Sequence, residues 1–214
     1  DSTNISRIKR IIKKTKNSQI KVGYKFGLEF LNSKNGRNFI SKLNKEIIFA
    51  DLKIHDIPNT CESSIKALKD LKIDYLTIHI SSGLEALRVA KKASGKIKLI
   101  GVTILTSLDN RALREIGFNK DVKKLVLHQA KLANKAKLDA IVCSAQEVKL
   151  VKKVFKKEII TPGIRFSSKI NDQKRVLTPK QAYRNGANWL VIGRNITKGN
   201  IKKNIQSLID HLNQ

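Results

Sequence analysis

Short apolar, β-branched runs alternate with longer helical patterns along the chain, and this order limits the possible folds more than any other feature. The runs are apolar enough to be buried on both faces, which is typical of parallel strands covered by helices. The predicted strands span residues 20–24, 46–53, 75–80, 97–105, 140–144, 158–164 and 188–194. The predicted helices span residues 5–14, 36–43, 59–71, 84–93, 122–137, 145–155, 179–185 and 201–212. We therefore expect an α/β protein with a parallel sheet.

The repeat favours a (β/α)8 TIM barrel. One helical pattern precedes the first of the seven predicted strands, so we expect that the first strand of an eight-unit barrel is largely missing from the chain, which opens at Asp1 and contains no Met. A doubly wound open sheet is the alternative, but its usual glycine-rich first turn is not visible in the sequence. No linker or low-complexity stretch breaks the repeat, which predicts a single domain over residues 1–214.

The net charge is unusual, because 44 Lys and Arg residues against 17 Asp and Glu residues give +27. Such an excess normally indicates nucleic-acid binding. The lysines are spread along the chain in pairs, however, and aromatic residues make up only 5%, so no base-stacking surface is predicted. We interpret the charge mainly as codon bias, and keep a nucleic-acid-binding barrel without catalysis as the alternative. A phosphorylated substrate would also benefit from the positive field.

Cysteine content and hydropathy bear on location. Two cysteines, Cys61 and Cys143, are too few for a disulfide framework and suit a reducing compartment. No apolar run approaches the ~20 residues of a membrane span, and no signal-peptide pattern is present. We expect a cytoplasmic protein with no membrane partner.

The segment Asp51-Leu52-Lys53-Ile54-His55-Asp56-Ile57-Pro58-Asn59-Thr60 contains the main candidate site. Strand periodicity places Asp51 and Lys53 on one side, and in a barrel that side faces the mouth, where the chemistry occurs. Asp56 follows just past the strand, and Lys21 is a second lysine within an apolar strand. The alternative is an ion pair with a purely structural role.

Arginines and a glycine near the last two strands form a second candidate site. Arg165 follows one of these strands, and Gly193 and Arg194 end the other. In barrels the loops at these positions commonly bind phosphate, which arginine can hold with two hydrogen bonds. Coincidence in so basic a chain is the alternative.

Together these segments resemble the orotidine 5'-phosphate decarboxylase family. The signature at residues 51–60 matches almost letter for letter, and the supporting segments occur in the family's order. They are Lys21-Val22-Gly23, Leu105-Thr106-Ser107, Thr161-Pro162-Gly163-Ile164-Arg165, Asp172-Gln173 and Ile192-Gly193-Arg194. The similarity spans essentially the whole chain.

The resemblance implies decarboxylation of orotidine 5'-phosphate to uridine 5'-phosphate, the last step of de novo pyrimidine (UMP) biosynthesis, with no metal or other cofactor. The family's alternating charge network would consist of Lys21, Asp51, Lys53 and Asp56. Lys53 would donate a proton to the pyrimidine carbon, and Asp51 would lie beside the substrate carboxylate.

The resemblance also assigns substrate contacts and a partner. The family is homodimeric with shared active sites, so Asp56 and Thr60 would act in the site of the partner chain. Asp1 and Lys21 would bind the ribose, and Thr106 the pyrimidine edge, with Ser107 as the close alternative. The phosphate would be held by Arg165, Gln173, Gly193 and Arg194.

The nearest rival is a metal-dependent sugar-phosphate decarboxylase or aldolase of the same barrel superfamily, which shares the Asp-x-Lys-x-x-Asp pattern. Those enzymes hold their metal partly with an acidic residue where Lys21 stands. A lysine at that position would repel the metal, which favours the orotidine interpretation.

Overall fold

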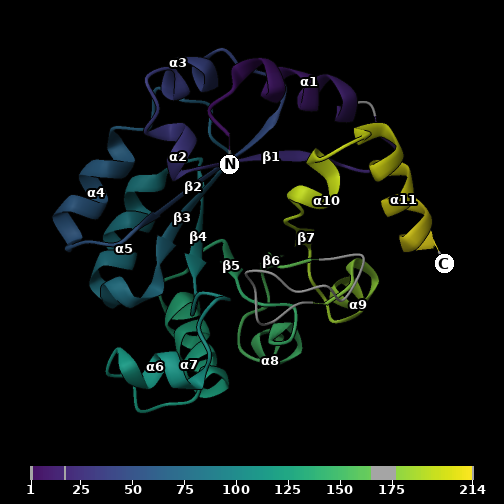
Figure 1. Cartoon of the computed structure of the whole chain (residues 1–214). Coiled ribbons are helices and arrows are strands. Elements are labelled where there is room, and N and C mark those ends of the chain that lie inside the picture. The colour runs from purple at the N-terminus through teal and green to yellow at the C-terminus, as the bar shows by residue number, and fades with distance from the viewer. Residues whose placement is uncertain (1, 17, 165–176, 214) are drawn as a thin grey trace.

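The computed structural model describes residues 2–16, 18–164 and 177–213. Its seven strands form one parallel sheet in sequential order, and Figure 1 shows the sheet curled with the helices outside it. The strands are β1 (Gly23–Gly27), β2 (Ile47–Ile54), β3 (Tyr75–His79), β4 (Lys98–Val102), β5 (Ala140–Val142), β6 (Glu158–Thr161) and β7 (Trp189–Leu190). This sequential parallel order is the order of a β/α barrel.

Helices connect the strands and cover the outer face of the sheet. The longer ones are α1 (Ile5–Thr15), α4 (Pro58–Lys66), α5 (Gly83–Ser94), α7 (Val122–Lys135) and α11 (Ile201–Asn213). The shorter ones are α2 (Leu28–Leu31), α3 (Gly36–Ser41), the 3₁₀ helix η1 (Ile80–Ser82), α6 (Asn110–Glu115), α8 (Val148–Lys152), α9 (Pro179–Arg184) and α10 (Arg194–Thr197). No helix in these described ranges is long and apolar enough to cross a membrane.

The curled sheet does not close on itself. Within the described ranges β1 pairs only with β2, and β7 only with β6, so these two strands are its edges. Outside them α1 packs against α11, which joins the two ends of the helical layer. The observed fold is a seven-stranded, partly closed β/α barrel.

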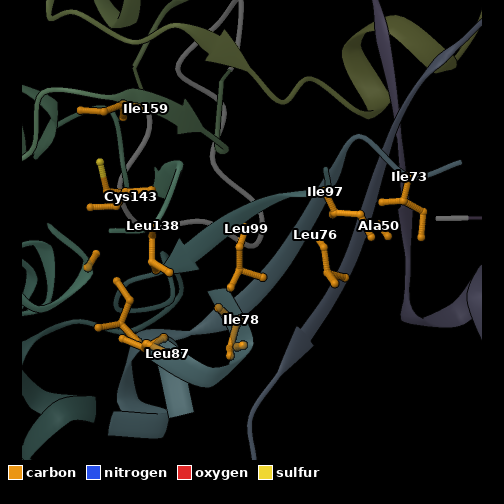
Figure 2. Packing of buried hydrophobic residues seen from close by; sticks show 14 of the residues in the cluster. Ala50, Ile73, Leu76, Ile78, Leu87, Ile97, Leu99, Leu138, Cys143 and Ile159 are labelled. Carbon is orange, nitrogen blue, oxygen red and sulfur yellow. The ribbon is translucent and has the colours of Figure 1, made fainter. Parts of the chain in front are cut away.

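The main core lies between the sheet and the helices. Figure 2 shows Leu76 and Ile78 of β3, Leu99 of β4 and Leu87 of α5 within it. These four side chains are fully buried. Each such burial contributes about 1.5–3 kcal/mol to folding, so this layer supplies most of the rigidity under the site.

The other face of each strand points into the barrel. Tyr75, Ile100, Ala140 and Ile160 form a separate buried cluster there, with Trp189 packed against it. Because side chains alternate along a strand, these positions fix which neighbouring residues also face inward. On β2 and β3, inward positions continue to the carboxyl ends of the strands, where the candidate site lies.

The predicted strands all exist, but several boundaries were wrong. The largest shift is at the first strand, which was predicted at 20–24 and is Gly23–Gly27. Phe26 anchors this later segment, because its ring lies 5.0 Å from that of Phe30 and 6.3 Å from that of Phe39. The strand predicted at 188–194 is shortened to Trp189–Leu190, and the short helices α2, α6 and α10 were not predicted.

Candidate active site

Three ionisable side chains meet inside the barrel at the carboxyl ends of β1 and β2. The register pairs Gly27 with Asp51 and Lys25 with Phe49, so Lys25 lies two residues before the level of Asp51, within reach of its side chain. Lys25 Nζ donates to Asp51 Oδ2 at 3.0 Å, and Lys53 Nζ donates to the same oxygen at 2.9 Å. We call Lys25, Asp51 and Lys53 the mouth cluster.

The mouth cluster joins a buried anion to two accessible cations. The Asp51 side chain is only 10% exposed, whereas those of Lys25 and Lys53 are 25% and 34% exposed. Burial alone raises the pKa of Asp51, but the two ammonium groups outweigh it and leave the pKa below its usual value. Asp51 is therefore ionised at neutral pH, and among the described residues two ammonium groups share one of its oxygens.

A β-bulge shapes this part of β2. Ala50 pairs with Leu76 and Ile54 with Ile78, so four steps along β2 are opposed by two along β3. Lys53 lies within the bulge and has φ +49°, in the left-handed region that non-glycine residues seldom adopt. Bulges re-aim side chains next to active sites, and this one lies at the predicted proton donor.

Lys21, predicted as a member of the charge network, lies outside the mouth cluster. Lys21 precedes β1, and its ammonium lies 5.6 Å from the ring centroid of Trp189, the first residue of β7. That is the amino-terminal end of the barrel, about 13 Å along the strand from Lys25 at ~3.3 Å per residue. Lys25, and not Lys21, is hydrogen-bonded to Asp51.

A second Lys-x-Gly triplet was the signal that could have identified Lys25. Lys25-Phe26-Gly27 follows Lys21-Val22-Gly23 at a spacing of four residues. Both lysines fall on the same face of a strand, so periodicity alone does not distinguish them. Only the pairing of Gly27 with Asp51 selects the second.

Asp56 and Thr60 lie beyond the end of β2. Asp56 is exposed, and its carboxylate accepts a hydrogen bond from the Ile57 backbone N–H at 2.7 Å. No ion pair joins Asp56 to Lys53 within the described part of this single chain. Thr60 is half-buried in the first turn of α4. The structure thus brings Asp51 and Lys53 together but leaves Asp56 exposed and outside the mouth cluster.

The other predicted substrate contacts are only partly described. Thr106 is half-buried in the turn after β4, with Ser107 exposed beside it. Gly193 and Arg194 are exposed at the start of α10, just after β7, and thus at the same end of the barrel as the mouth cluster. Asp1, Arg165 and Gln173 lie outside the described residues.

Histidine 79, which ends β3, lies on the inward face next to the mouth cluster. Burial, His55 and Lys53 all lower its pKa, against a smaller opposing effect of Asp51. The His79 imidazole is therefore neutral at neutral pH and adds no further charge. Its ring centroid lies 5.2 Å from that of His55.

The remaining candidates are structural. Cys61 and Cys143 are both buried, and neither forms a disulfide. Within the described residues, no group of three or more His, Cys, Asp or Glu side chains is placed to hold a metal ion.

A parallel sheet curled into a barrel, with ionisable side chains gathered at the carboxyl ends of its strands, defines an enzyme of the β/α-barrel class. Comparison with known proteins identifies the family within this class. A sequence model of the orotidine 5'-phosphate decarboxylase / HUMPS family matches residues 1–205. The chain belongs to this family.

Individual relatives agree with the family match. A protein of Wolbachia sp. subsp. Brugia malayi, named orotidine 5'-phosphate decarboxylase, is 47% identical over 198 residues, 88% of this chain and 87% of the relative. One of the same name from Aquifex aeolicus is 38% identical, covering 84% of this chain and 78% of the relative. A crystal structure of orotidine 5'-phosphate decarboxylase from Lactobacillus acidophilus superposes with a TM-score of 0.82 at 31% identity, covering 100% of this chain and 96% of that one.

Proposed function

We propose that this chain is a carboxy-lyase that converts orotidine 5'-phosphate to uridine 5'-phosphate, the last step of de novo pyrimidine biosynthesis, with Lys53 as the proton donor. The family and the names of the relatives support the activity. The observation that supports the mechanism best is the mouth cluster, in which two ammonium groups share one oxygen of a buried carboxylate.

The chemistry of the step explains why a fixed ammonium is useful. When carbon dioxide leaves, the electron pair of the broken C–C bond stays on the pyrimidine carbon as a carbanion. Lys53 Nζ donates a proton to that carbon, forming the C–H bond and leaving a neutral amine. An ammonium already held at 2.9 Å from Asp51 needs little reorganisation as the negative charge develops. Asp51 would lie beside the departing carboxylate.

Lys25 takes the place in this mechanism that the sequence assigned to Lys21. Its contact with Asp51 Oδ2 keeps that carboxylate ionised and fixed, so that Lys53 stays aimed at the substrate. From the level of the mouth it can also contact a ribose hydroxyl. Lys21, near Trp189 at the other end, is not available for either task.

The phosphate would bind at the carboxyl end of the last strands. Gly193 and Arg194 are exposed there and leave room for an anion. The predicted contacts from Arg165 and Gln173 to the phosphate, from Asp1 to the ribose and from Thr106 to the pyrimidine remain parts of this proposal. Binding energy from the phosphate can be used to position the reacting carbon.

We infer a homodimer with shared sites from the region after β2. Asp56 is exposed and forms no ion pair with the described mouth cluster, and the next residue, Ile57, is 65% exposed although it is large and apolar. Pairing with a second copy would cover Ile57 and carry Asp56 and Thr60 to the partner's site. The family's alternating network would then be completed between subunits.

The eight-stranded barrel is also a proposal. A cavity of about 760 Å³ separates the two edge strands, and its walls include Gly23 and Phe26 of β1, Trp189 of β7, Ile8 of α1 and Leu208 of α11. One further parallel strand between β1 and β7 would satisfy both open edges. The single domain over residues 1–214 and the cytoplasmic location stay predictions.

The rival metal-dependent sugar-phosphate chemistry is disfavoured by Lys25. A cation at the carboxyl end of β1, already paired with Asp51, would repel a divalent metal held by the same carboxylate. The two proposals differ in whether activity survives a chelator.

Ultraviolet absorbance of orotidine 5'-phosphate mixed with the protein tests the proposal, because the orotate ring changes its absorbance when the carboxylate leaves. We expect the signal to change with the wild type in excess chelator. No change with the wild type, together with turnover of a sugar phosphate that chelator abolishes, would contradict the proposal in favour of the rival.

A further inference from the structure

Threonine 77, in the middle of β3, contacts both reacting members of the mouth cluster. Its Oγ1 accepts a hydrogen bond from the Lys53 backbone N–H at 2.8 Å and donates one to Asp51 Oδ1 at 3.1 Å. The side chain is fully buried. It therefore meets Asp51 on the oxygen that the two lysines do not use.

Because of the bulge, Thr77 lies opposite three residues of β2. Leu76 pairs with Ala50 and Ile78 with Ile54, so Thr77 alone faces the segment from Asp51 to Lys53. A regular ladder would pair the Lys53 N–H with a backbone carbonyl of β3. Here a side-chain hydroxyl takes that role, and its own proton is directed to Asp51.

We propose that Thr77 is a positioning residue for the decarboxylation, which holds the bulged backbone of Lys53 and the carboxylate of Asp51 in one fixed arrangement. The inference rests on the proposed role of Lys53. Lys53 has φ +49°, a conformation that persists only where its surroundings stabilise it. A hydroxyl that both accepts and donates is the smallest group able to join that N–H to a carboxylate oxygen.

The role predicts an effect on the chemical step rather than on binding. Thr77 is fully buried behind the mouth cluster and bonds only to these two residues among the described hydrogen bonds. Its contribution is therefore realised in the transition state, through the alignment of Lys53 and Asp51, so its loss lowers kcat more than it raises KM.

The test compares Thr77→Val with Thr77→Ser. Valine keeps the branched shape and removes the hydroxyl, and we expect kcat to fall by about tenfold to a hundredfold, the loss of one or two hydrogen bonds to a charged pair. We expect KM to change by less than about threefold, and serine, which keeps the hydroxyl, to restore most of kcat. If Thr77→Val does not fold, Thr77→Ala is used in its place, because alanine lacks the γ-methyl group that valine would place against the Lys53 amide.

Thr15→Val is the matched control. Thr15 is another buried threonine, 2% exposed, whose hydroxyl lies 2.8 Å from Tyr24 Oη in the last turn of α1, away from the mouth cluster. We expect it to lose thermal stability but keep wild-type kcat. Wild-type kcat in Thr77→Val or Thr77→Ala would overturn the inference, as would a kcat loss that serine does not restore. The proposed function would still stand if Lys53→Ala remained inactive in the same assay.

Discussion

Among the described residues, two ion clusters lie in the barrel interior, one toward each end, and they differ in how the carboxylate is bonded. The floor cluster lies at the amino-terminal end, where Lys98 Nζ donates to Glu158 Oε1 at 2.5 Å and Tyr75 Oη donates to Glu158 Oε2 at 2.8 Å. It has one cation for one anion. In the mouth cluster two ammonium groups bind one oxygen of Asp51. Thr77, which contacts Asp51, follows Tyr75 by two residues on β3, a step of about 7 Å.

The difference separates a structural ion pair from a reactive one. In the floor cluster both carboxylate oxygens of Glu158 are bonded, and the Lys98 ammonium also lies 5.1 Å from the centroid of the Tyr75 ring. In the mouth cluster both ammonium groups bind the same oxygen of Asp51, and the Lys53 side chain is 34% exposed. The Lys53 ammonium is thus accessible to an anionic substrate, whereas both oxygens of Glu158 at the floor are already bonded within the protein.

After the loss of Lys53 itself, the largest expected effect distinguishes Lys25 from Lys21. Lys25→Ala removes one of the two cations on Asp51, and we expect kcat to fall by roughly 10²- to 10³-fold, as for loss of a preorganised electrostatic contact. Lys21→Ala at the floor end should keep kcat within about threefold, because distant sites act independently. Steady-state kinetics of the two purified variants check this. The reverse order of effects would restore the sequence-based assignment.

Mixing inactive variants tests whether the mouth cluster is completed by a partner subunit. Asp56→Ala and Lys53→Ala chains are each expected to be nearly inactive. Mixed in equal amounts and allowed to exchange, they should recover about a quarter of wild-type activity, because half of the two-fold symmetric dimers are hybrids with one intact site of two. Wild-type protein is taken through the same exchange procedure as a control for loss of activity. Absence of recovery, with hybrid dimers detected by mass spectrometry, would argue against shared sites.

Glu158→Gln should affect stability and leave catalysis unchanged. Glutamine keeps the shape but weakens the contacts with Lys98 and Tyr75, and the partial exposure of the pair limits the loss in unfolding free energy to about 1 kcal/mol. Urea denaturation monitored by circular dichroism measures the loss, with kcat measured in parallel. A fall in kcat as large as that of Lys25→Ala would remove the distinction between floor and mouth.

The smallest effect is on the pH dependence of stability. Burial raises the pKa of Glu158, but hydrogen bonds from Lys98 and Tyr75 outweigh it and leave the pKa lowered. A lowered pKa in the folded state means that ionised Glu158 stabilises the fold above about pH 4, and that this contribution is lost as the pH falls through the folded value. Glu158→Gln should therefore lose less stability than the wild type when urea melts are compared at pH values on either side of about 4. A steeper loss in the variant would contradict this sign.

The sequence was sufficient to predict most of the fold and the centre of the site. Seven β-branched runs gave seven parallel strands, because strands buried on both faces are almost continuously apolar. Periodicity placed Asp51 and Lys53 on one face, and they are hydrogen-bonded at 2.9 Å. Asp51 and Lys53 are two residues apart on one strand, and sequence patterns describe such local relations well.

What the sequence did not predict depends on contacts between strands. Lys21 and Lys25 share a face because they are four residues apart, so only the register with β2 distinguishes them. Thr77 looked like an ordinary β-branched residue of a buried strand, since its importance comes from a bulge in its neighbour. Neither the register of a strand nor a bulge in the neighbouring strand can be predicted from the sequence of that strand alone.

The central claim is that the mouth cluster, and not the similar cluster at the floor, carries the chemistry. The most direct test measures the ultraviolet decarboxylation assay with Lys53→Ala and Lys98→Ala side by side, after circular dichroism has shown both to be folded. We predict that Lys53→Ala loses roughly 10³-fold or more in kcat, as for combined loss of a proton donor and its charge, while Lys98→Ala stays within about threefold of the wild type. Near-normal turnover by folded Lys53→Ala would contradict the account.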